Sequence, residues 1–373
     1  SALSTSQLVT GTFKPGNTDT TTDALRAPAP AAPYNNPAPA GVATFASSFG
    51  SDGSTMNGTW SLYVRDDAGN DTGSFAGGWS LTFEANDFAC TGVNNVTPKS
   101  RADFDGDGKT DLSVFRPAEG NWYLNRSTDG FSAVQFGVSA DIIVPGNYDS
   151  DSKTDVAVFR PSEGKWYLLR STGGFAAIQF GQSGDIPQPG NFDADPEDEL
   201  MVFRPSSGTW FSINIDGSGF SAIQFGQNGD VPVSGDFDGD GKEEPAVFRP
   251  SNATWYVRTS NGDASQAQFG VSTDLPVPAD YNGDNRDDLA VFRPSNGTWY
   301  VWRGTGVPSQ NFDSVQFGAS GDVPVPGDYD GDGKDDFAVY RNGTWFMNRS
   351  TSGFASAGFG LATDRAVPKY YIP

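Results

Sequence analysis

Regularly spaced carboxylates are the side chains of this chain best suited to chemistry. The first run is Asp103, Asp105, Asp107 and Asp111, which puts an acid at positions 1, 3, 5 and 9 of a nine-residue segment. When such a segment curls, alternate side chains converge on one point, and the backbone carbonyl of position 7 can complete the ligand set. Six or more oxygen ligands in a flexible loop suit Ca²⁺, because Mg²⁺ demands tighter octahedral geometry. The pattern therefore predicts a calcium site.

The same nine-residue pattern occurs six times along the chain. Of the 24 side chains at positions 1, 3, 5 and 9, 21 are carboxylates and three are Asn. We expect up to six Ca²⁺ ions, one in each loop. With position 7 included for its carbonyl, the predicted metal ligands are Asp103, Asp105, Asp107, Lys109, Asp111, Asn147, Asp149, Asp151, Lys153, Asp155, Asn191, Asp193, Asp195, Glu197, Glu199, Asp236, Asp238, Asp240, Lys242, Glu244, Asp280, Asn282, Asp284, Arg286, Asp288, Asp328, Asp330, Asp332, Lys334 and Asp336.

Solvated acidic turns are the alternative interpretation, since Asp and Asn favour turns. Six loops in register argue against it, because so many crowded carboxylates would repel one another without a cation. The six sites should differ in strength. Loops one, four and six carry Gly at position 6 (Gly108, Gly241 and Gly333), where a sharp turn is easiest. The third loop has Pro196 there and should bind most weakly or be empty.

The loops belong to a longer repeat that covers residues 103–373. Each unit contains an acidic loop, an apolar run, a Trp-aromatic pair, a Gln-Phe-Gly-like segment and an Asp-apolar-Pro-like segment. The string Val-Phe-Arg-Pro or a close variant begins at Val114, Val158, Val202, Val247, Val291 and Val339, at spacings of 44, 44, 45, 44 and 48 residues. Four short β-prone segments in a unit of about 45 residues are typical of a propeller blade. We predict an all-β, six-bladed β-propeller, with seven blades as the second choice.

The two ends of the repeat region predict how the ring closes. Residues 364–368 match the segment that precedes each acidic loop, but no loop follows them. Either this last segment or residues 96–102 should complete the first blade as its innermost strand. Placing both ends in one blade would leave no open sheet edge.

Two further residue types recur once in every unit. The Trp of each unit is predicted to pack between blades, and stacking on a sugar is the alternative if the ring is exposed. The Arg of each unit is predicted to pair with the Asp of the Asp-apolar-Pro segment. These arginines are Arg116, Arg160, Arg204, Arg249, Arg293 and Arg341.

Composition excludes several classes of activity. The 373 residues include no His and a single Cys, Cys90, so Ser-His-Asp hydrolysis, His-ligated zinc and an internal disulfide are excluded within this chain. A net charge of −22 disfavours nucleic-acid binding. No apolar run approaches the roughly 20 residues of a membrane helix, so we expect no membrane insertion. A carboxylate-pair glycosidase is the remaining enzymatic alternative. The metal loops already account for almost all the acidic clusters, and we therefore predict no catalytic residues.

Residues 1–93 lack the repeat. They contain an Ala/Pro-rich segment, 27–41, and two strand-like segments, 58–64 and 78–83, which flank an acidic turn at 66–73 that is a further candidate calcium loop. Residues 94–102 are predicted to be a linker or a closing strand.

The six units resemble FG-GAP or VCBS-type repeats of extracellular propellers, a family that includes integrin α-chain heads and lectins. The acidic loop and the Phe-Gly ending carry this resemblance. It implies a secreted or surface-exposed protein that binds Ca²⁺ in these loops and serves cell adhesion, carbohydrate binding or protein docking.

Residues 57–83 are similar to the end of the P (Homo B) domain, a jelly-roll-like β-sandwich that accompanies proprotein convertases and many bacterial secreted proteins. The resemblance covers only the later part of such a domain. Either the chain is a fragment, or another chain supplies the missing strands by strand addition.

These observations favour a non-enzymatic extracellular protein whose calcium-stabilised propeller is an adhesion platform for a glycan or protein ligand on a cell or matrix surface. One alternative is a structural subunit of an extracellular filament or bacterial surface layer that self-assembles through the N-terminal sandwich. The other is the accessory C-terminal region of a secreted subtilisin-like protease.

Overall fold

The computed structural model describes residues 101–193, 195–259, 262–302 and 311–368. The chain divides into two units, residues 1–89 and 90–373, and the described residues belong to the second. The predicted sandwich, its Ala/Pro-rich segment and its acidic turn lie outside them. In the described part of the chain, no helix has the length and apolar character needed to cross a bilayer.

The described residues form six four-stranded antiparallel sheets, the blades. Blade 1 consists of β24 (Arg365–Ala366), β1 (Leu112–Arg116), β2 (Asn121–Arg126) and β3 (Gly130–Gln135). Blade 2 consists of β4 (Ile142–Ile143), β5 (Val156–Arg160), β6 (Lys165–Arg170) and β7 (Gly174–Gln179). Blade 3 consists of β8 (Ile186–Pro187), β9 (Leu200–Arg204), β10 (Thr209–Ile213) and β11 (Ser221–Gln224).

The other three blades follow the same order from the first strand to the fourth. Blade 4 consists of β12 (Val231–Gly235), β13 (Glu244–Arg249), β14 (Thr254–Arg258) and β15 (Ala264–Gln268). Blade 5 consists of β16 (Leu275–Pro276), β17 (Ala290–Arg293), β18 (Thr298–Trp302) and β19 (Phe312–Gln316). Blade 6 consists of β20 (Val323–Pro324), β21 (Phe337–Arg341), β22 (Thr344–Arg349) and β23 (Gly353–Gly358).

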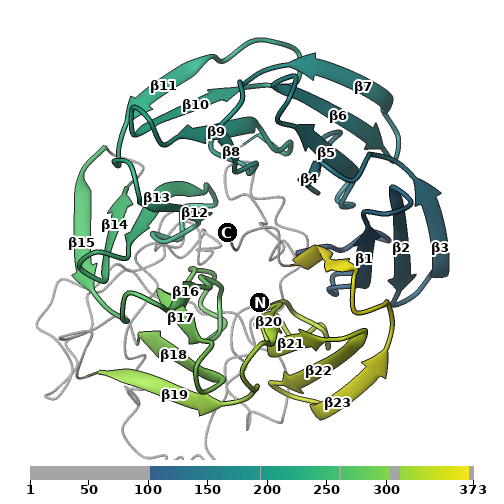
Figure 1. Ribbon diagram of the computed structural model, residues 1–373, viewed down its shortest axis with the longest axis vertical. Helices are drawn as coiled ribbons and strands as arrows, with labels where there is room; N and C mark the ends of the chain where they lie inside the picture. The colour runs from purple at the N-terminus through teal and green to yellow at the C-terminus, as the bar shows by residue number, and fades with distance from the viewer. Residues whose placement is uncertain (1–100, 194, 260–261, 303–310, 369–373) are drawn as a thin grey trace, which may run out of the picture. The chain divides into compact units, whose positions relative to one another are not determined.

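The blades stand around a common axis, with the short first strand of each sheet innermost and the fourth strand at the rim (Figure 1). Buried apolar clusters fill the seams between neighbouring blades. Phe115 and Trp122 of blade 1, for example, pack with Val158 of blade 2. Val114 and Ala366 of blade 1 pack with Trp345 of blade 6. The predicted six-bladed β-propeller is confirmed.

The C-terminal strand closes the ring. In β24, Ala366 pairs with Val114 and Arg365 pairs with Phe115 of β1. The yellow end of the chain therefore lies beside the first strand of the repeat region (Figure 1). Of the two predicted ways to complete blade 1, the structure shows the one that uses the end of the chain.

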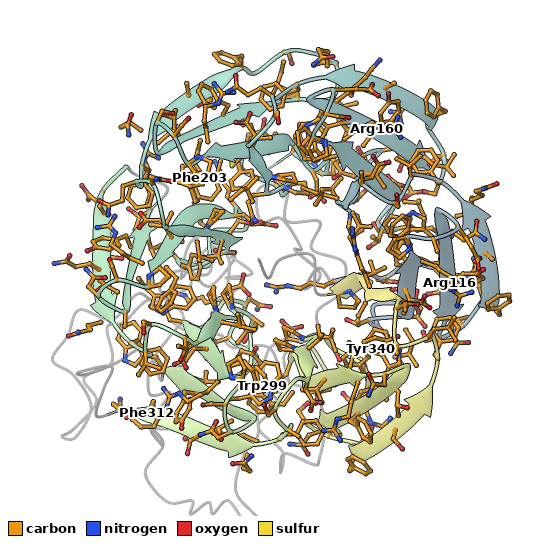
Figure 2. The ribbon with its side chains drawn as sticks, in the orientation of Figure 1. Arg116, Arg160, Phe203, Trp299, Phe312 and Tyr340 are labelled. Atoms are coloured by element: carbon orange, nitrogen blue, oxygen red, sulfur yellow. The ribbon has the colours of Figure 1, made fainter. Side chains whose placement is uncertain are left out.

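The recurring tryptophans are buried between blades, as predicted. All six are at most 1 % exposed, which excludes sugar stacking on these rings. Each indole N–H donates to the carbonyl of a Phe that follows the fourth strand of the same blade, as Trp299 does to Phe317 at 2.8 Å. Trp299 is one of the labelled core residues in Figure 2.

The recurring arginines pair with the predicted aspartates. Each guanidinium donates two hydrogen bonds to an Asp carboxylate that is fully buried, and each lies over an aromatic ring of the adjacent strand. In blade 2, Arg160 binds Asp141 at 2.8 and 3.0 Å and lies 4.5 Å from the centre of the Tyr167 ring. The six pairs are Arg116–Asp364, Arg160–Asp141, Arg204–Asp185, Arg249–Asp230, Arg293–Asp274 and Arg341–Asp322. Arg116 and Arg160 lie in neighbouring blades (Figure 2).

One of these pairs also joins the two ends of the ring. Replacing Asp364 by Ala should leave Arg116 without its buried partner and should lower the free energy of unfolding by about 3 kcal/mol. Asp322→Ala in blade 6 is the matched control. It should cost less, because Arg341 is 42 % exposed and its blade is made from one continuous segment. Urea unfolding of both variants measures the difference, and an Asp364→Ala variant as stable as the parent would contradict the closing role.

Candidate metal centre

The six acidic loops form a closed circle of backbone hydrogen bonds. Each loop leads into the second strand of its blade, in five blades directly from the innermost strand, so all six lie at the same end of the ring. The amide of position 8 in each loop donates to the carbonyl of position 1 in the preceding loop, over 2.6–2.7 Å. The pairs are Thr110–Asp328, Thr154–Asp103, Asp198–Asn147, Glu243–Asn191, Asp287–Asp236 and Asp335–Asp280. Backbone hydrogen bonds therefore link each loop to the next all the way around the axis.

Acidic side chains at position 8 add a second contact in three of these pairs. The carboxylates of Asp198, Asp287 and Asp335 accept the amide of position 1 in the preceding loop, at 2.7, 3.1 and 3.1 Å. The residue before position 1 must be small where such a side chain packs on it. A Cβ added to Gly146 would lie 2.7 Å from an Asp198 carboxylate oxygen. Sequence reasoning missed this position, although four of the six loops carry an acid there.

Arg101 lies among the position 8 carboxylates. Its guanidinium is 3.4 Å from Asp287 and largely buried. Burial raises the pKa of Asp287 to about 6 and that of Asp335 to about 7, and the positive charge of Arg101 opposes both rises. Arg101 therefore offsets part of the negative charge that the circle of loops collects.

The Asp at position 1 organises its own loop. One oxygen of Asp103 accepts the amides of Gly106 at 2.7 Å and Asp107 at 3.2 Å, and the other accepts the amide of Gly108 at 2.8 Å. The loops that begin with Asp236, Asp280 and Asp328 have the same arrangement. Loops two and three begin with Asn. Its side chain has only one acceptor oxygen, so it cannot accept backbone amides at both of its terminal atoms as Asp does.

Position 3 leaves a carboxylate oxygen without a donor. The Oδ2 of Asp105 accepts the amides of Thr128 and Asp129 at 2.9 Å, and its Oδ1 is buried with no hydrogen-bond partner in the described residues. The same holds for Oδ1 of Asp149 and of Asp330. Burying a charged oxygen without a partner is costly. A bound cation is one group that would satisfy these atoms.

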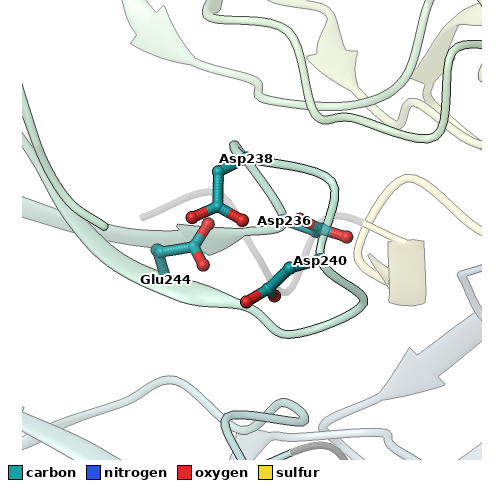
Figure 3. Close-up of side chains that lie close together, drawn as sticks. All are labelled: Asp236, Asp238, Asp240 and Glu244. Atoms are coloured by element: carbon teal, nitrogen blue, oxygen red, sulfur yellow. The ribbon is translucent and has the colours of Figure 1, made fainter. Parts of the chain in front are cut away.

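Five of the loops gather carboxylates closely enough for one ion. Within each group, one oxygen from every member lies within 4.8 Å of the others, which matches twice a typical Ca–O distance of about 2.4 Å. Figure 3 shows the fullest group, in loop four, where all four predicted acids come together. The groups are Asp103, Asp105 and Asp111; Asp149, Asp151 and Asp155; Asp193, Asp195 and Glu199; Asp236, Asp238, Asp240 and Glu244; Asp328, Asp330 and Asp332.

Some predicted ligands stand outside these groups. Asp107 turns to the tip of the β2–β3 hairpin, where it accepts the hydroxyls of Ser127 and Thr128. In loop five, the amide of Asn282 donates to Asp288 at 3.0 Å and takes the place of a carboxylate. The described acids of that loop form no three-carboxylate group within the same distance.

Hairpin tips are a part of the site that sequence reasoning missed. Ser127, Ser171 and Ser350 donate their amides to the position 9 carboxylates, all at 2.7 Å. Their hydroxyls bind the position 5 carboxylates. The recurring Arg-Ser-Thr at residues 126–128, 170–172 and 349–351 is the signal that could have revealed them.

Five of the position 9 acids are buried and Asp288 is half-buried. Burial raises the pKa values of five of the six, with neighbouring carboxylates adding to the rise. The pKa values rise to about 7 for Asp111, 6 for Asp155, 8 for Glu199, 7 for Asp288 and 6 for Asp336. Each of these carboxylates also accepts the backbone amide of position 2 in its own loop, as Asp111 does from Phe104 at 2.8 Å. Such groups ionise more readily when a cation is beside them. The all-oxygen donor set and the donorless buried oxygens fit Ca²⁺.

Comparisons with known proteins agree with the repeat. The sequence pattern of the FG-GAP-like repeat matches residues 280–339. No curated protein matches the chain.

Solved structures share a broad likeness to the chain. BBS1N in complex with ARL6DN is 14 % identical, with a TM-score of 0.47, and the match covers 70 % of this chain and 80 % of that one. A lectin of Agrocybe aegerita that recognises non-reducing terminal N-acetylglucosamine is 12 % identical, with a TM-score of 0.44 and coverage of 71 % and 92 %. Virginiamycin B lyase from Staphylococcus aureus is 9 % identical, with a TM-score of 0.43 and coverage of 70 % and 88 %.

The raised pKa values predict how the metal-free protein responds to pH. A carboxyl whose pKa is higher in the folded state than in the unfolded chain stabilises the fold at low pH, and that stability is lost as pH rises through the folded pKa. In EGTA, the melting temperature should therefore fall between pH 5 and pH 8. Calcium should reduce the fall, because it favours the ionised carboxylates. Differential scanning calorimetry tests this, and a metal-free melting temperature that rises over this range would contradict it.

Proposed function

We propose that this protein is a non-enzymatic, extracellular binding platform whose six-bladed propeller is stabilised by Ca²⁺ in its acidic loops. It presents a surface for adhesion to a glycan or protein ligand on a cell or matrix. The observation that carries the proposal is the closed circle of loops in which buried carboxylate oxygens lack a hydrogen-bond donor.

Calcium would act on the whole ring through this circle. The position 1 carbonyl of one loop accepts the amide of the next, so a loop that unwinds removes a contact from its neighbour. An ion bound to Asp105 and Asp111 would offset their mutual repulsion and hold the segment between them. The same ion would keep the β2–β3 hairpin tip near the loop, because Ser127 and Thr128 bind the same acids. The third loop, with Pro196 at position 6, should contribute least.

Two considerations support a binding role rather than catalysis. The chain has no His, and the loop acids that could serve as a catalytic pair are held by backbone amides inside their own loops. Acidic loops of this kind in extracellular modules bind Ca²⁺ at about 10⁻⁴–10⁻³ M, so an extracellular location would keep them loaded. The match of residues 280–339 to the FG-GAP-like repeat supports the same reading.

Calcium titration tests the proposal. At about twenty times the dissociation constant, each occupied site should add roughly 2 kcal/mol to the free energy of unfolding, and the melting temperature should rise by several degrees. Calorimetric scans with calcium, with magnesium and with EGTA measure this rise. Asp105→Asn should reduce the calcium-dependent part, because it removes the negative charge and leaves one acceptor oxygen for both the ion and the amides of Thr128 and Asp129.

Asp216→Asn is the matched control, since Asp216 is exposed and lies outside the acidic loops. It should leave the calcium response unchanged. Coincident melting curves in calcium and in EGTA would contradict calcium stabilisation.

A further inference from the structure

The seam between blades 3 and 4 differs from the other five seams of the ring. Its buried apolar cluster has four members, including Phe203, against six to nine in the others (Figure 2). A cavity of about 280 Å³ opens there. This is nearly twice the ~150 Å³ cavity that accommodates benzene in an engineered protein interior, so the space is large enough for a small molecule.

Polar residues stand at two positions where every other blade places an apolar one, and a charged residue stands at a third position. Ser212 of β10 occupies the site of Leu124, Leu168, Val257, Val301 and Met347. On the inner strand, Gln188 replaces the Val of every other blade, and its Oε1 is buried without a partner in the described residues. On the facing blade, Arg258 of β14 stands where blades 2, 3 and 5 place Leu169, Ile213 and Trp302, which pack into the preceding seam of their own blades, and where blades 1 and 6 carry Asn.

An exchange of large and small side chains between β9 and β10 accounts for only part of these substitutions. Met201 pairs with Ser212 across β9 and β10, whereas blade 2 pairs Ala157 with Leu168. The large side chain has thus moved one strand inward, and the space near Ser212 and Ser221 stays open. Ser212 is itself only 9 % exposed. A buried hydroxyl beside a cavity favours a polar occupant over an empty space.

The charges at the cavity fall into two sets. Four carboxylates line the cavity, and each accepts a hydrogen bond within the protein. Glu199 accepts the amide of Phe192 at 2.6 Å, and Glu243 accepts the hydroxyl of Ser234 at 2.7 Å. Asp193 accepts the amide of Asp195 at 3.1 Å, and Glu244 accepts the amide of Phe237 at 2.8 Å. Two cations, Lys242 and Arg258, also line the cavity. Throughout the described part of the chain, neither side chain forms a hydrogen bond or ion pair, so both are available to an anionic group.

We propose that this cavity, the blade 3–4 pocket, binds a small organic carboxylate with a compact apolar body. Arg258 and Lys242 receive the carboxylate, and Met201, Ile223 and Pro245 contact the apolar part. The inference deepens the proposed binding role and rests on it. Asp193, Glu199 and Glu244 of the lining also belong to the acidic groups of loops three and four, so calcium bound there would offset their negative charge and strengthen the attraction. Two sources share this chemistry: a free acid, or the C-terminal residue of a peptide.

Isothermal titration calorimetry in calcium buffer tests the pocket with two pairs of probes. The first pair is 4-methylpentanoate and its primary amide, and the second is a pentapeptide that ends in Leu with a free or an amidated terminus. At least one acid should bind, with its amide tenfold weaker or more. Binding of only one pair identifies the source of the ligand. No binding by either acid, or equal binding of acid and amide, would overturn the proposal.

Amino-acid substitutions distinguish a loss of ligand binding from a loss of stability. Arg258→Gln should weaken the acid at least tenfold, whereas Lys165→Gln, which removes a positive charge from β6, should have no effect. Met201→Ala with Ser212→Leu restores the pairing of blade 2, and it should abolish binding while keeping the melting temperature at or above that of the parent. Unchanged affinity in either pocket variant would contradict the site.

The failure of this inference is distinguishable from that of the calcium proposal. If EGTA leaves the melting temperature unchanged while the acid still binds, the pocket stands and calcium stabilisation fails. If calcium raises the melting temperature but neither acid binds, the pocket fails and calcium stabilisation stands.

Discussion

The structure depends on crowded negative charge at one end of the ring. Six acidic loops meet there and are joined by short backbone hydrogen bonds between position 8 and position 1 of neighbouring loops. This geometry brings carboxylates together that would separate in an unfolded chain. Burial and neighbouring carboxylates raise the pKa values of Asp111 and Glu199 at position 9, and in the described residues three oxygens at position 3 have no hydrogen-bond donor. Arg101 supplies one positive charge, and the proposed calcium ions would supply the rest.

Each blade also contains a buried carboxylate whose charge is compensated by groups of the protein itself. Each buried Asp that precedes an innermost strand receives a guanidinium and a backbone amide, as Asp141 does from Arg160 and Val138. The guanidinium is also covered by an aromatic ring on one face. Buried carboxylates of two kinds thus occur in one repeat. One kind is satisfied by the chain, and the other is the kind for which we propose an ion.

Much of the fold could be predicted from the sequence because the same residue pattern, with the same structural roles, recurs in six units. The Trp, the Arg and the loop acids recur at fixed offsets, so the blade number and the Arg–Asp pairs followed from spacing. The closing strand was narrowed to two candidates, residues 364–368 and 96–102, and the structure selects the first. The contacts between loops could not be predicted in this way. The role of position 8 depends on how neighbouring blades approach, and the role of Ser127 depends on a hairpin 16 residues beyond Asp111. The blade 3–4 pocket likewise arises from substitutions on two different blades.

A crystal structure grown in calcium and recorded at a long X-ray wavelength tests the central claim most directly. Calcium scatters anomalously there, so each ion gives its own peak in the map. We expect peaks between the position 3 and position 9 carboxylates, strongest in loops one, four and six and weakest in loop three. Well-ordered loops with the same hydrogen-bonded circle and no anomalous peak in any of them would contradict the account.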